Sequence, residues 1–254
     1  MRQEYPILEF DATPEAVIEP AGVIKAGDVP EHCVLCFFQD VIEELRHEDR
    51  LARIACSNSE MGENPIYAME VDGKPLVVCH PGVGAPFAAW MLEELIALGC
   101  RKFVACGGAG VLDREIACGQ IVVPLAAIRD EGTSYHYLPP SREVKANSEA
   151  VAAIEQTLQH HGYKYVIGKT WTTDGIYRET PKKVQLRRSE GCVTVEVEAA
   201  AFFAVAQHRR VLFGHMLYGG DDVSGASWDH REWTNQLSVR EKLLWLAAEA
   251  CLSL

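Results

Sequence analysis

Two spacings of apolar residues alternate along the chain, and they predict strands and helices in turn. Short apolar runs and period-two patterns, typical of strands, occur at 32–38, 65–82, 101–110, 119–132, 164–173, 194–197 and 210–220. Apolar residues at helical spacing occur at 39–50, 85–99, 148–162, 180–191, 198–208 and 239–254. We expect a hairpin turn at Asp72-Gly73, a helix N-cap at Ser148, helix ends at Gly99 and Gly162, and Pro181 in a first helical turn.

This alternation predicts a mixed, partly parallel sheet flanked by helices. Because no linker, repeat or low-complexity stretch divides the sequence, we expect one domain over 1–254 with an extended lead-in over 1–30. In open α/β sheets, ligands bind beyond the carboxyl ends of strands. Three unusual segments lie there: PGVG at 81–84, CGGAG at 106–110 and YGGDDVSG at 218–225.

Composition narrows the classes of function. The net charge of −12 over 254 residues disfavours binding to nucleic acid. No window reaches the ~20 apolar residues that a membrane helix needs, and the N-terminus lacks a signal-peptide core, so we expect a cytoplasmic protein with no membrane partner. The nine cysteines are scattered in apolar company, as in reduced proteins. Cys33 and Cys36 form a CxxC inside a predicted strand, which we interpret as structural, and we expect no metal site.

Glycines mark two predicted strand-to-helix turns. Gly82 and Gly84 follow one strand, and Gly107, Gly108 and Gly110 follow another. Such turns let backbone amides approach a ligand, and a following helix N-terminus favours anions. Neither run is a complete nucleotide-binding fingerprint. Tight turns with no ligand are the alternative, but two of them at strand ends favour a polar-ligand site.

Two carboxylates stand before an apolar helix in TVEVEAAAFFAVA, 194–206. In a strand, Glu196 and Glu198 would point to one face and could meet one ligand. Glu198 also opens the helix, where the dipole stabilises negative charge. The alternative is a capping role for Glu198 and a surface position for Glu196. Because a buried unpaired carboxylate is costly, we favour a functional Glu198, for which two adjacent hydroxyls are a natural ligand.

Other polar side chains follow later strands. Asp221 and Asp222 come after 210–220 and could act as general acid or base, or simply form a turn. The segment TTDGIYRETP, 172–181, is either a base-binding loop or a helix cap. The segment 131–140, with His136, is either functional or a surface or oligomer-contact loop. The segment 224–235 is polar, aromatic and glycine-containing, as a mobile lid is, and we interpret His230 as an exposed loop histidine.

The ordered set of motifs resembles the nucleoside phosphorylase superfamily, which includes uridine phosphorylases, purine nucleoside phosphorylases and hydrolytic nucleosidases. VEVEAAA resembles the EMEAA-type signature of that family. The other segments that carry the resemblance are, in chain order, DGKPLVVCHPGVGAPFAAWMLEELIALGCRKFVACGGAGVL, GQIVVP, RDEGTSYHYLPP, TTDGIYRETP and YGGDD. The resemblance covers roughly residues 30 to 254, and DEGTSYHYLPP looks most like the uridine phosphorylase branch.

The resemblance implies a three-layer α/β/α sandwich around a mixed, partly barrel-like sheet, and cleavage of the N-glycosidic bond of a nucleoside. It implies that Glu198 binds the ribose hydroxyls and that Glu196 is the neighbouring family acid. Val197, where the family usually has Met, would pack on the sugar. Because the transition state is oxocarbenium-like, a carboxylate held against the sugar would stabilise its positive charge.

Further positions follow from the same resemblance. Gly107 and Gly108 match the turn that lines the base and phosphate pockets. Gly84, in the earlier glycine turn, is expected to contact the substrate because its backbone can approach a ligand closely. The loop from Thr173 through Ile176 to Arg178 matches the base-contacting segment. Asp221 matches the aspartate that protonates the leaving base in purine-cleaving members, and Asp222, one position away, is the alternative acid and a substrate contact.

The sequence departs from the family at its phosphate-binding positions. CFFQDVIEEL replaces a Gly…Arg loop, and the family's arginine and threonine fall on Ala105 and Gly108. Arg53 is the nearest candidate for the arginine that a neighbouring subunit supplies. The N-terminal histidine and the uracil-reading Gln and Arg have no clear match, although Arg178 could substitute. A buried phosphate dianion requires fixed cations, whereas water does not.

Three hypotheses follow. The first is a pentosyltransferase that releases free base and pentose 1-phosphate from uridine or a purine nucleoside. The second is a phosphate-independent nucleosidase, and the third is a nucleoside-binding relative without chemistry. We expect no cofactor apart from phosphate as a possible co-substrate, and a homo-oligomer, either a dimer or a hexamer built from dimers.

Overall fold

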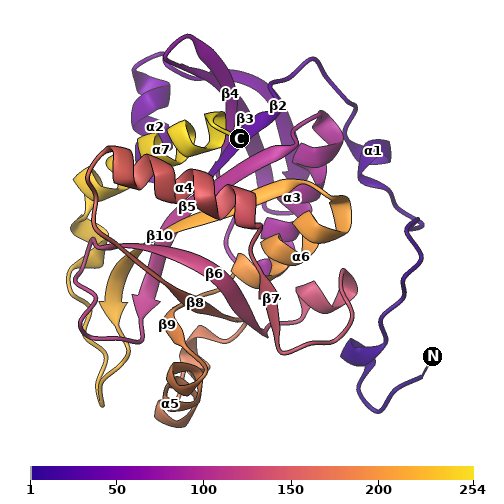
Figure 1. Ribbon diagram of the computed structural model, residues 1–254. Coiled ribbons are helices and arrows are strands. Elements are labelled where there is room, and N and C mark those ends of the chain that lie inside the picture. Colours follow the sequence, from indigo (N-terminus) through magenta and orange to yellow (C-terminus); the bar gives the residue numbers. More distant parts are fainter. Residues whose placement is uncertain (1) are drawn as a thin grey trace.

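The computed structural model describes residues 2–254 and contains one mixed sheet of ten strands (Figure 1). The strands are β1 (His32–Cys36), β2 (Ala52–Ser59), β3 (Gly62–Val71), β4 (Lys74–Cys79), β5 (Lys102–Val111), β6 (Ile121–Asp130), β7 (Glu143–Lys145), β8 (Tyr165–Thr173), β9 (Cys192–Glu196) and β10 (Leu212–Asp222). Their order is β10-β6-β8-β9-β5-β1-β4-β3-β2, with β7 on the edge of β6. Because β10 also pairs with β5, the strands β5, β6, β8, β9 and β10 close into a barrel.

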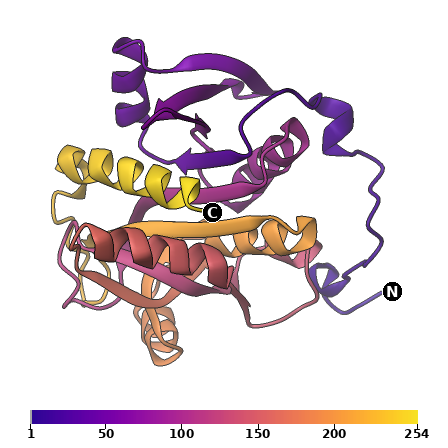
Figure 2. The same cartoon turned by 45° about the horizontal axis from the view of Figure 1, so that its top comes forward.

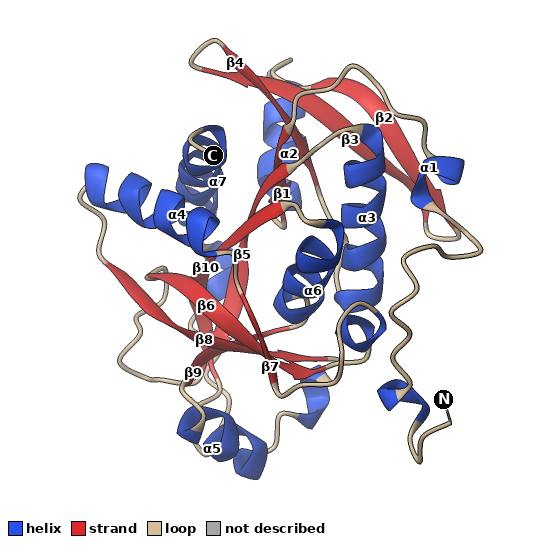
Figure 3. Cartoon of the chain, turned by 45° about the vertical axis from the view of Figure 1, so that its right-hand side comes forward, coloured by secondary structure: helices blue, strands red, loops and turns tan. Residues whose placement is uncertain are grey.

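Helices surround the sheet, and four of them pack together in two pairs (Figure 3). They are α1 (Pro20–Val23), α2 (Gln39–His47), α3 (Ala85–Leu98), α4 (Ser148–His160), α5 (Pro181–Ser189), α6 (Ala199–Arg209) and α7 (Leu237–Leu252), with short 3-10 turns at Pro6–Leu8, Thr133–His136, Ile176–Arg178 and Trp233–Asn235. Helix α3 packs against α6, and α4 packs against α7. The predicted α/β fold with a barrel-like sheet is confirmed.

Helix α6 lies deep in the molecule, as its composition predicts. Its residues Ala199 to Ala206 are all buried, and Phe202 stacks on Phe213 of β10 with ring centroids 4.8 Å apart. Burial of this apolar surface holds the helix rigidly against the barrel. The N-terminus of α6 is therefore held rigidly, and a side chain at that end has a fixed position.

Several local expectations were wrong. The glycines of CGGAG lie inside β5 and do not form a turn. Asp221 and Asp222 are the last residues of β10, and Asn147, not Ser148, caps α4 by accepting from the Ala150 N–H at 2.9 Å. The hairpin at Asp72-Gly73 and the start of α5 at Pro181 are confirmed.

The lead-in contains two short helical turns, Pro6–Leu8 and α1, and runs along the outside of the molecule (Figure 2). Helix α1 contacts α3, and the first turn contacts the turn at Thr133–His136. Strand β2 was missed because half of the residues in ARIACSNS are exposed and the segment carries no apolar run. Among residues 2–254, none of the helices combines the length and apolar character needed to cross a membrane.

Candidate functional site

Glu196 is the cap of helix α6. Its Oε2 accepts hydrogen bonds from the backbone N–H groups of Glu198 at 2.7 Å and Ala199 at 2.6 Å. Its Oε1 accepts from the hydroxyl of Thr172 at 2.6 Å, and that hydroxyl accepts from the Ala200 N–H at 2.9 Å. A carboxylate at a helix N-terminus satisfies unpaired amides and complements the helix dipole. Because both oxygens are occupied, the structure gives Glu196 a capping role where the sequence suggested contact with a ligand.

Glu198 is held differently, at the boundary between β9 and α6. Strand β9 ends at Glu196, so the expected strand alternation does not relate the two acids. The Glu198 side chain is only 5% exposed, and its Oε1 accepts from the Gly84 N–H at 2.7 Å. Among the described residues, no side chain donates a hydrogen bond to this carboxyl group. Glu198 is therefore rigidly placed but retains hydrogen-bonding capacity for a ligand.

The protonation of Glu198 reflects this environment. Burial raises its pKa to about 8, the neighbouring Glu196 adds to the increase, and the backbone N–H of Gly84 opposes it. The carboxyl group of the unliganded protein is thus mostly protonated at neutral pH. Donors that bind the charged form would shift it towards the carboxylate, because hydrogen bonding to the anion lowers a pKa.

Gly84 is at the N-cap of α3 with φ of +93°, a conformation that favours glycine. This geometry points its N–H at Glu198, so the PGVG turn and the start of α6 meet. Val197, half-buried, separates Glu196 from Glu198. The structure thus brings Gly84 and Glu198 together, and Val197 directly precedes Glu198 in the chain.

Gly107 and Gly108 lie in β5, and packing explains why both are small. A Cβ on Gly107 would lie 3.0 Å from the Phe37 ring, and a Cβ on Gly108 would lie 3.1 Å from the Tyr218 ring. Phe37 in turn lies between His80 and His215, with ring centroids 5.9 and 6.3 Å away. The glycines therefore let aromatic side chains pack tightly against β5.

The two histidines beside Phe37 carry no charge at neutral pH. Burial lowers the pKa of His80, and it lowers the pKa of His215 to about 3. Neither ring nitrogen of His215 has a hydrogen-bond partner among residues 2–254. Ala105, at the position of the family arginine, is fully buried. Ala105 and these two imidazoles are therefore neutral groups, and none of the three carries a positive charge at neutral pH.

The two aspartates at the end of β10 have different surroundings. Asp222 is buried, and its carboxylate accepts from Arg231 at 2.6 Å and from the Ser224 N–H at 2.7 Å. Burial raises its pKa, but Ser224 and Arg231 outweigh burial and leave it lowered. The carboxylate of Asp221 lies over Gly110, where a Cβ would be 3.5 Å from Oδ1, and its Oδ2 accepts from the Trp228 indole N–H at 2.6 Å. Asp221 therefore accepts fewer hydrogen bonds from the protein than Asp222 does.

The loop from Thr173 to Arg178 joins β8 to α5. Thr173 is buried, and its hydroxyl accepts from the Gly175 N–H at 3.2 Å. Ile176 and Arg178 are exposed. Asp174 accepts from the Gly132 N–H at 2.8 Å, which ties the loop to the segment before Thr133–His136. Thr173 thus shapes the turn, while Ile176 and Arg178 remain available on the surface.

Glu179, at the end of this loop, was not singled out from the sequence. Burial, followed by the charge of Asp221, raises its pKa to about 7. Two carboxyl groups therefore influence each other across the loop and the end of β10. No local signal in YRETP reveals this, because the proximity of the two acids depends on how the barrel places the ends of β8 and β10, two strands that β6 separates in the sheet.

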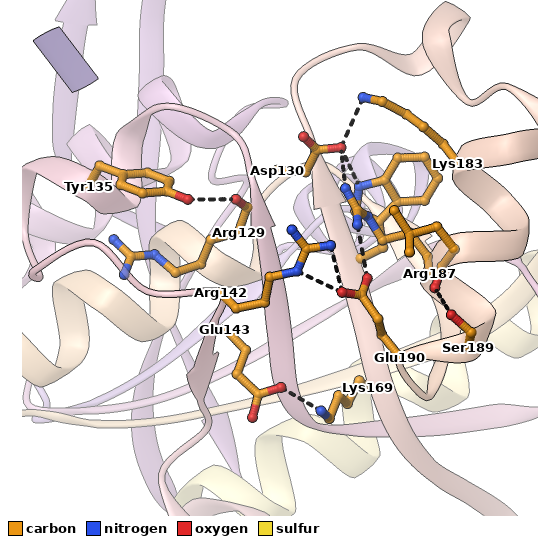
Figure 4. A network of polar contacts seen from close by, with 12 residues as sticks. Arg129, Asp130, Tyr135, Arg142, Glu143, Lys169, Lys183, Arg187, Ser189 and Glu190 are labelled. Atoms are coloured by element: carbon orange, nitrogen blue, oxygen red, sulfur yellow. Dashed lines mark hydrogen bonds and ion pairs between the residues drawn. The ribbon is translucent and has the colours of Figure 1, made fainter. Parts of the chain in front are cut away.

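An ionic network fixes the helix that follows the loop (Figure 4). Arg187 of α5 is buried and donates to Asp130 at 3.1 Å and to Glu190 at 2.9 Å, while Lys183 donates to Asp130 at 3.0 Å. Burial raises the pKa of Asp130, but Lys183 and Arg187 outweigh it and leave it lowered. The network anchors α5 to the end of β6 and so positions the loop.

Other features lie apart from these residues. Two surface cavities of about 420 and 400 Å³ adjoin each other at Gln207, and neither is lined by a predicted site residue. Among residues 2–254, one group could hold a metal ion: the exposed side chains of His160, His161 and Glu249 at the ends of α4 and α7. Neither the cavities nor this group includes an acid discussed above.

Comparisons with known proteins agree on one family. A sequence model of the family described as "Phosphorylase superfamily" matches residues 31–252. Guanosine phosphorylase of Halorubrum lacusprofundi is 27% identical over 200 residues, 77% of this chain and 80% of that protein. Uridine phosphorylase of Treponema pallidum is 30% identical over 208 residues, 76% of this chain and 78% of that protein.

Solved structures show the same fold. Purine nucleoside phosphorylase from Toxoplasma gondii, in complex with immucillin-H, is similar with a TM-score of 0.77 and 20% identity, covering 89% of this chain and 92% of that one. AMP nucleosidase from Bacteroides thetaiotaomicron has a TM-score of 0.71 and 23% identity, covering 88% and 87%. At these identities the structural likeness concerns the fold.

Proposed function

This chain belongs to the phosphorylase superfamily and is an enzyme of the nucleoside phosphorylase type, and we propose that it cleaves the N-glycosidic bond of uridine or a purine nucleoside, with inorganic phosphate as the acceptor. The relatives named guanosine phosphorylase and uridine phosphorylase support both kinds of base. The observation that carries the proposal is the buried, rigidly held Glu198 at the start of α6.

In this proposal Glu198 binds the ribose hydroxyls. The hydroxyls donate to its carboxylate and shift it from the protonated form of the empty site to the charged form. As the C1′–N bond breaks, positive charge develops on the ribose, and a fixed anion at short range stabilises it. The cap formed by Glu196 prevents α6 from shifting during this change.

Asp221 and Glu179 supply the proton for the leaving base. The base departs with the electron pair of the C1′–N bond, and a carboxylic acid close to it gives a proton to the developing anion. Glu179 has a pKa of about 7, so a large fraction of its carboxyl groups carries a proton at neutral pH. Asp222, engaged by Arg231, fixes the local backbone. An oxygen of phosphate forms the new bond to C1′.

Hydrolysis is the second candidate, and one observation favours it. The described residues around Phe37 provide neutral imidazoles and Ala105 where the family provides cations. Water needs no cationic site. Phosphorolysis would need a cation from elsewhere, and Arg53 of a second copy is the candidate; within one chain Arg53 forms an exposed ion pair with Glu63 at 3.0 Å.

The test is a panel of nucleosides incubated with and without phosphate, with products separated by chromatography. Phosphate-dependent release of base together with ribose 1-phosphate is expected. Equal rates without phosphate, giving free ribose, would select hydrolysis. If no nucleoside were cleaved but calorimetry showed nucleoside binding, the protein would be a nucleoside-binding relative without catalytic activity.

A further inference from the structure

The end of β10 folds back on itself to form a small hairpin. Asp222 and Asp229 exchange backbone hydrogen bonds, with the Asp222 N–H donating at 2.8 Å and the Asp229 N–H at 3.0 Å. Side chains alternate between the two faces of such a pair. The side chains of Asp222 and Asp229 therefore lie on one face, and those of Asp221 and Trp228 lie on the other.

Trp228 is in direct contact with the candidate acid. Its indole N–H donates to Oδ2 of Asp221 at 2.6 Å, although the residue is 63% exposed. The other oxygen, Oδ1, faces Gly110, where the absence of a side chain leaves room for the carboxylate. An indole is a donor only, so it binds the carboxylate through one oxygen and leaves the second available.

The opposite face of the hairpin is fixed by Arg231. Its guanidinium donates to Asp222 at 2.6 Å and to the carbonyl of Ile116 at 2.7 Å. Arg231 and Glu232 both have positive φ, +48° and +49°, a costly conformation for residues other than glycine. Such strain persists only where surrounding contacts hold it, and here it sets the path of the chain that carries Trp228.

Aromatic contacts also orient Trp228. Its ring meets His230 edge to face with centroids 5.2 Å apart, and His230 lies 6.1 Å from Trp233. The exposed indole is therefore fixed by three contacts: its hydrogen bond to Asp221, the hairpin backbone and His230. This arrangement is more specific than that expected for an isolated surface tryptophan.

We propose that Trp228 is a positioning residue for Asp221, which holds Oδ2 through its indole N–H so that Oδ1 is the oxygen that serves the leaving base. The inference rests on the proposed function, in which Asp221 assists departure of the base. The role concerns protonation of the base alone and leaves stabilisation of the ribose by Glu198 untouched. This separation makes the inference testable.

Other charged and titratable groups also act on Asp221. Glu179 faces it from the loop before α5, and the charge of Asp221 raises the pKa of Glu179. Cys118 lies near both Asp221 and Arg231, and its pKa is raised by burial. A change at Trp228 leaves both of these groups in place.

The experiment compares Trp228→Phe with wild type on two substrates. One is the best nucleoside of the panel, and the other is 4-nitrophenyl β-D-ribofuranoside, whose leaving group departs as a stable phenolate without a proton. We expect Trp228→Phe to lower kcat for the nucleoside about 10- to 100-fold, with little change in KM, and to change turnover of the nitrophenyl riboside by less than about twofold.

Two further variants make the comparison specific. Trp245→Phe removes an indole of α7 that contacts Arg50 and not Asp221, and it should behave as wild type. Trp228→Gln keeps an N–H donor and should recover part of the lost rate. An equal loss of kcat on both substrates would overturn the role of Trp228, and so would a Trp228→Phe variant whose kcat for the nucleoside equals that of wild type. A wild-type protein that cleaves neither substrate would overturn the proposed function and this role with it.

Discussion

Glu198 has an environment in which its charge is costly while the site is empty. Its carboxyl group is buried beside Glu196 and receives one backbone hydrogen bond. Adjacent hydroxyl donors would relieve that cost, so binding of the sugar and ionisation of Glu198 are coupled in the proposed mechanism. Strongly shifted pKa values are common at functional sites, which agrees with a functional role for Glu198.

Substitution of Glu198 by Gln tests its role in turnover. The amide keeps the size of the side chain but carries no charge for the oxocarbenium-like ribose. We expect kcat to fall about 10²- to 10³-fold, with the fold intact by circular dichroism. Full activity of Glu198→Gln would remove this residue from the mechanism.

The same variant tests the pH dependence of stability. The pKa of Glu198 in the folded protein, about 8, exceeds its value of about 4.3 in an unfolded chain. Its contribution to stability is therefore complete below pH ~4 and is lost as pH rises through about 8. We expect Glu198→Gln to melt above wild type at pH 9 by a larger margin than at pH 5, measured by calorimetry. A margin that is constant over this range would contradict the buried, protonated carboxyl group.

At the scale of elements, the strand-and-helix pattern could be read from the sequence wherever periodicity was strong. Helices α3, α5 and α7 and the β3–β4 hairpin follow directly from apolar spacing, Pro181 and Asp72-Gly73. The sequence could not show that Glu196 caps α6 while Glu198 faces Gly84. This difference depends on where β9 ends, and a shift of one residue in that end would change which acid caps the helix. The CGGAG strand was misjudged because its glycines serve packing against Phe37 and Tyr218.

The network on α5 gives a prediction at this scale. Asp130→Asn removes the anion shared by Lys183 and Arg187, and leaves Arg187 buried with a weaker partner. We expect a loss of about 2 kcal/mol in unfolding free energy at pH 7 and a higher KM for the nucleoside, because the loop from Thr173 to Glu179 loses its support. Denaturant unfolding and initial-rate kinetics measure the two effects.

The pH dependence and a control sharpen this test. The pKa of Asp130 is lowered in the fold, so its contribution is present above pH ~4 and is lost as pH falls below that. The difference between Asp130→Asn and wild type should therefore shrink near pH 3. Glu43→Gln breaks the exposed pair of Glu43 with Arg46 in α2 and should cost less than about 0.5 kcal/mol. Equal effects of the two substitutions would count against a special role for the network.

At the scale of the whole molecule, closure of the barrel brings the candidate site together. The pairing of β10 with β5 places Asp221 over Gly110, and the pairing of β8 with β9 places Thr172 beside Glu196. These long-range pairings leave no signal in a single sequence, which is why Glu179 and Trp228 went unnoticed. The order of the motifs, however, was sufficient to indicate the family.

A homo-oligomer is a further proposal at this scale. Val83 and Trp90 are 68% and 41% exposed near the start of α3, next to the Gly84 that holds Glu198. Contiguous exposed apolar patches are typical of surfaces that bind proteins, and we propose that these two side chains form part of such a surface. We expect a dimer, or a hexamer built from dimers, by light scattering, and a smaller species for Trp90→Glu but not for Tyr177→Glu, which changes a residue that is 97% exposed elsewhere. A wild-type monomer at micromolar concentration would contradict this proposal.

The most direct measurement is a crystal structure of the protein with a bound nucleoside or an unreactive nucleoside analogue. We expect the 2′ and 3′ hydroxyls of the ribose to lie within hydrogen-bonding distance of the Glu198 carboxylate, with the base towards Asp221. A sugar bound elsewhere, with Glu198 still donating or accepting only within the protein, would contradict it.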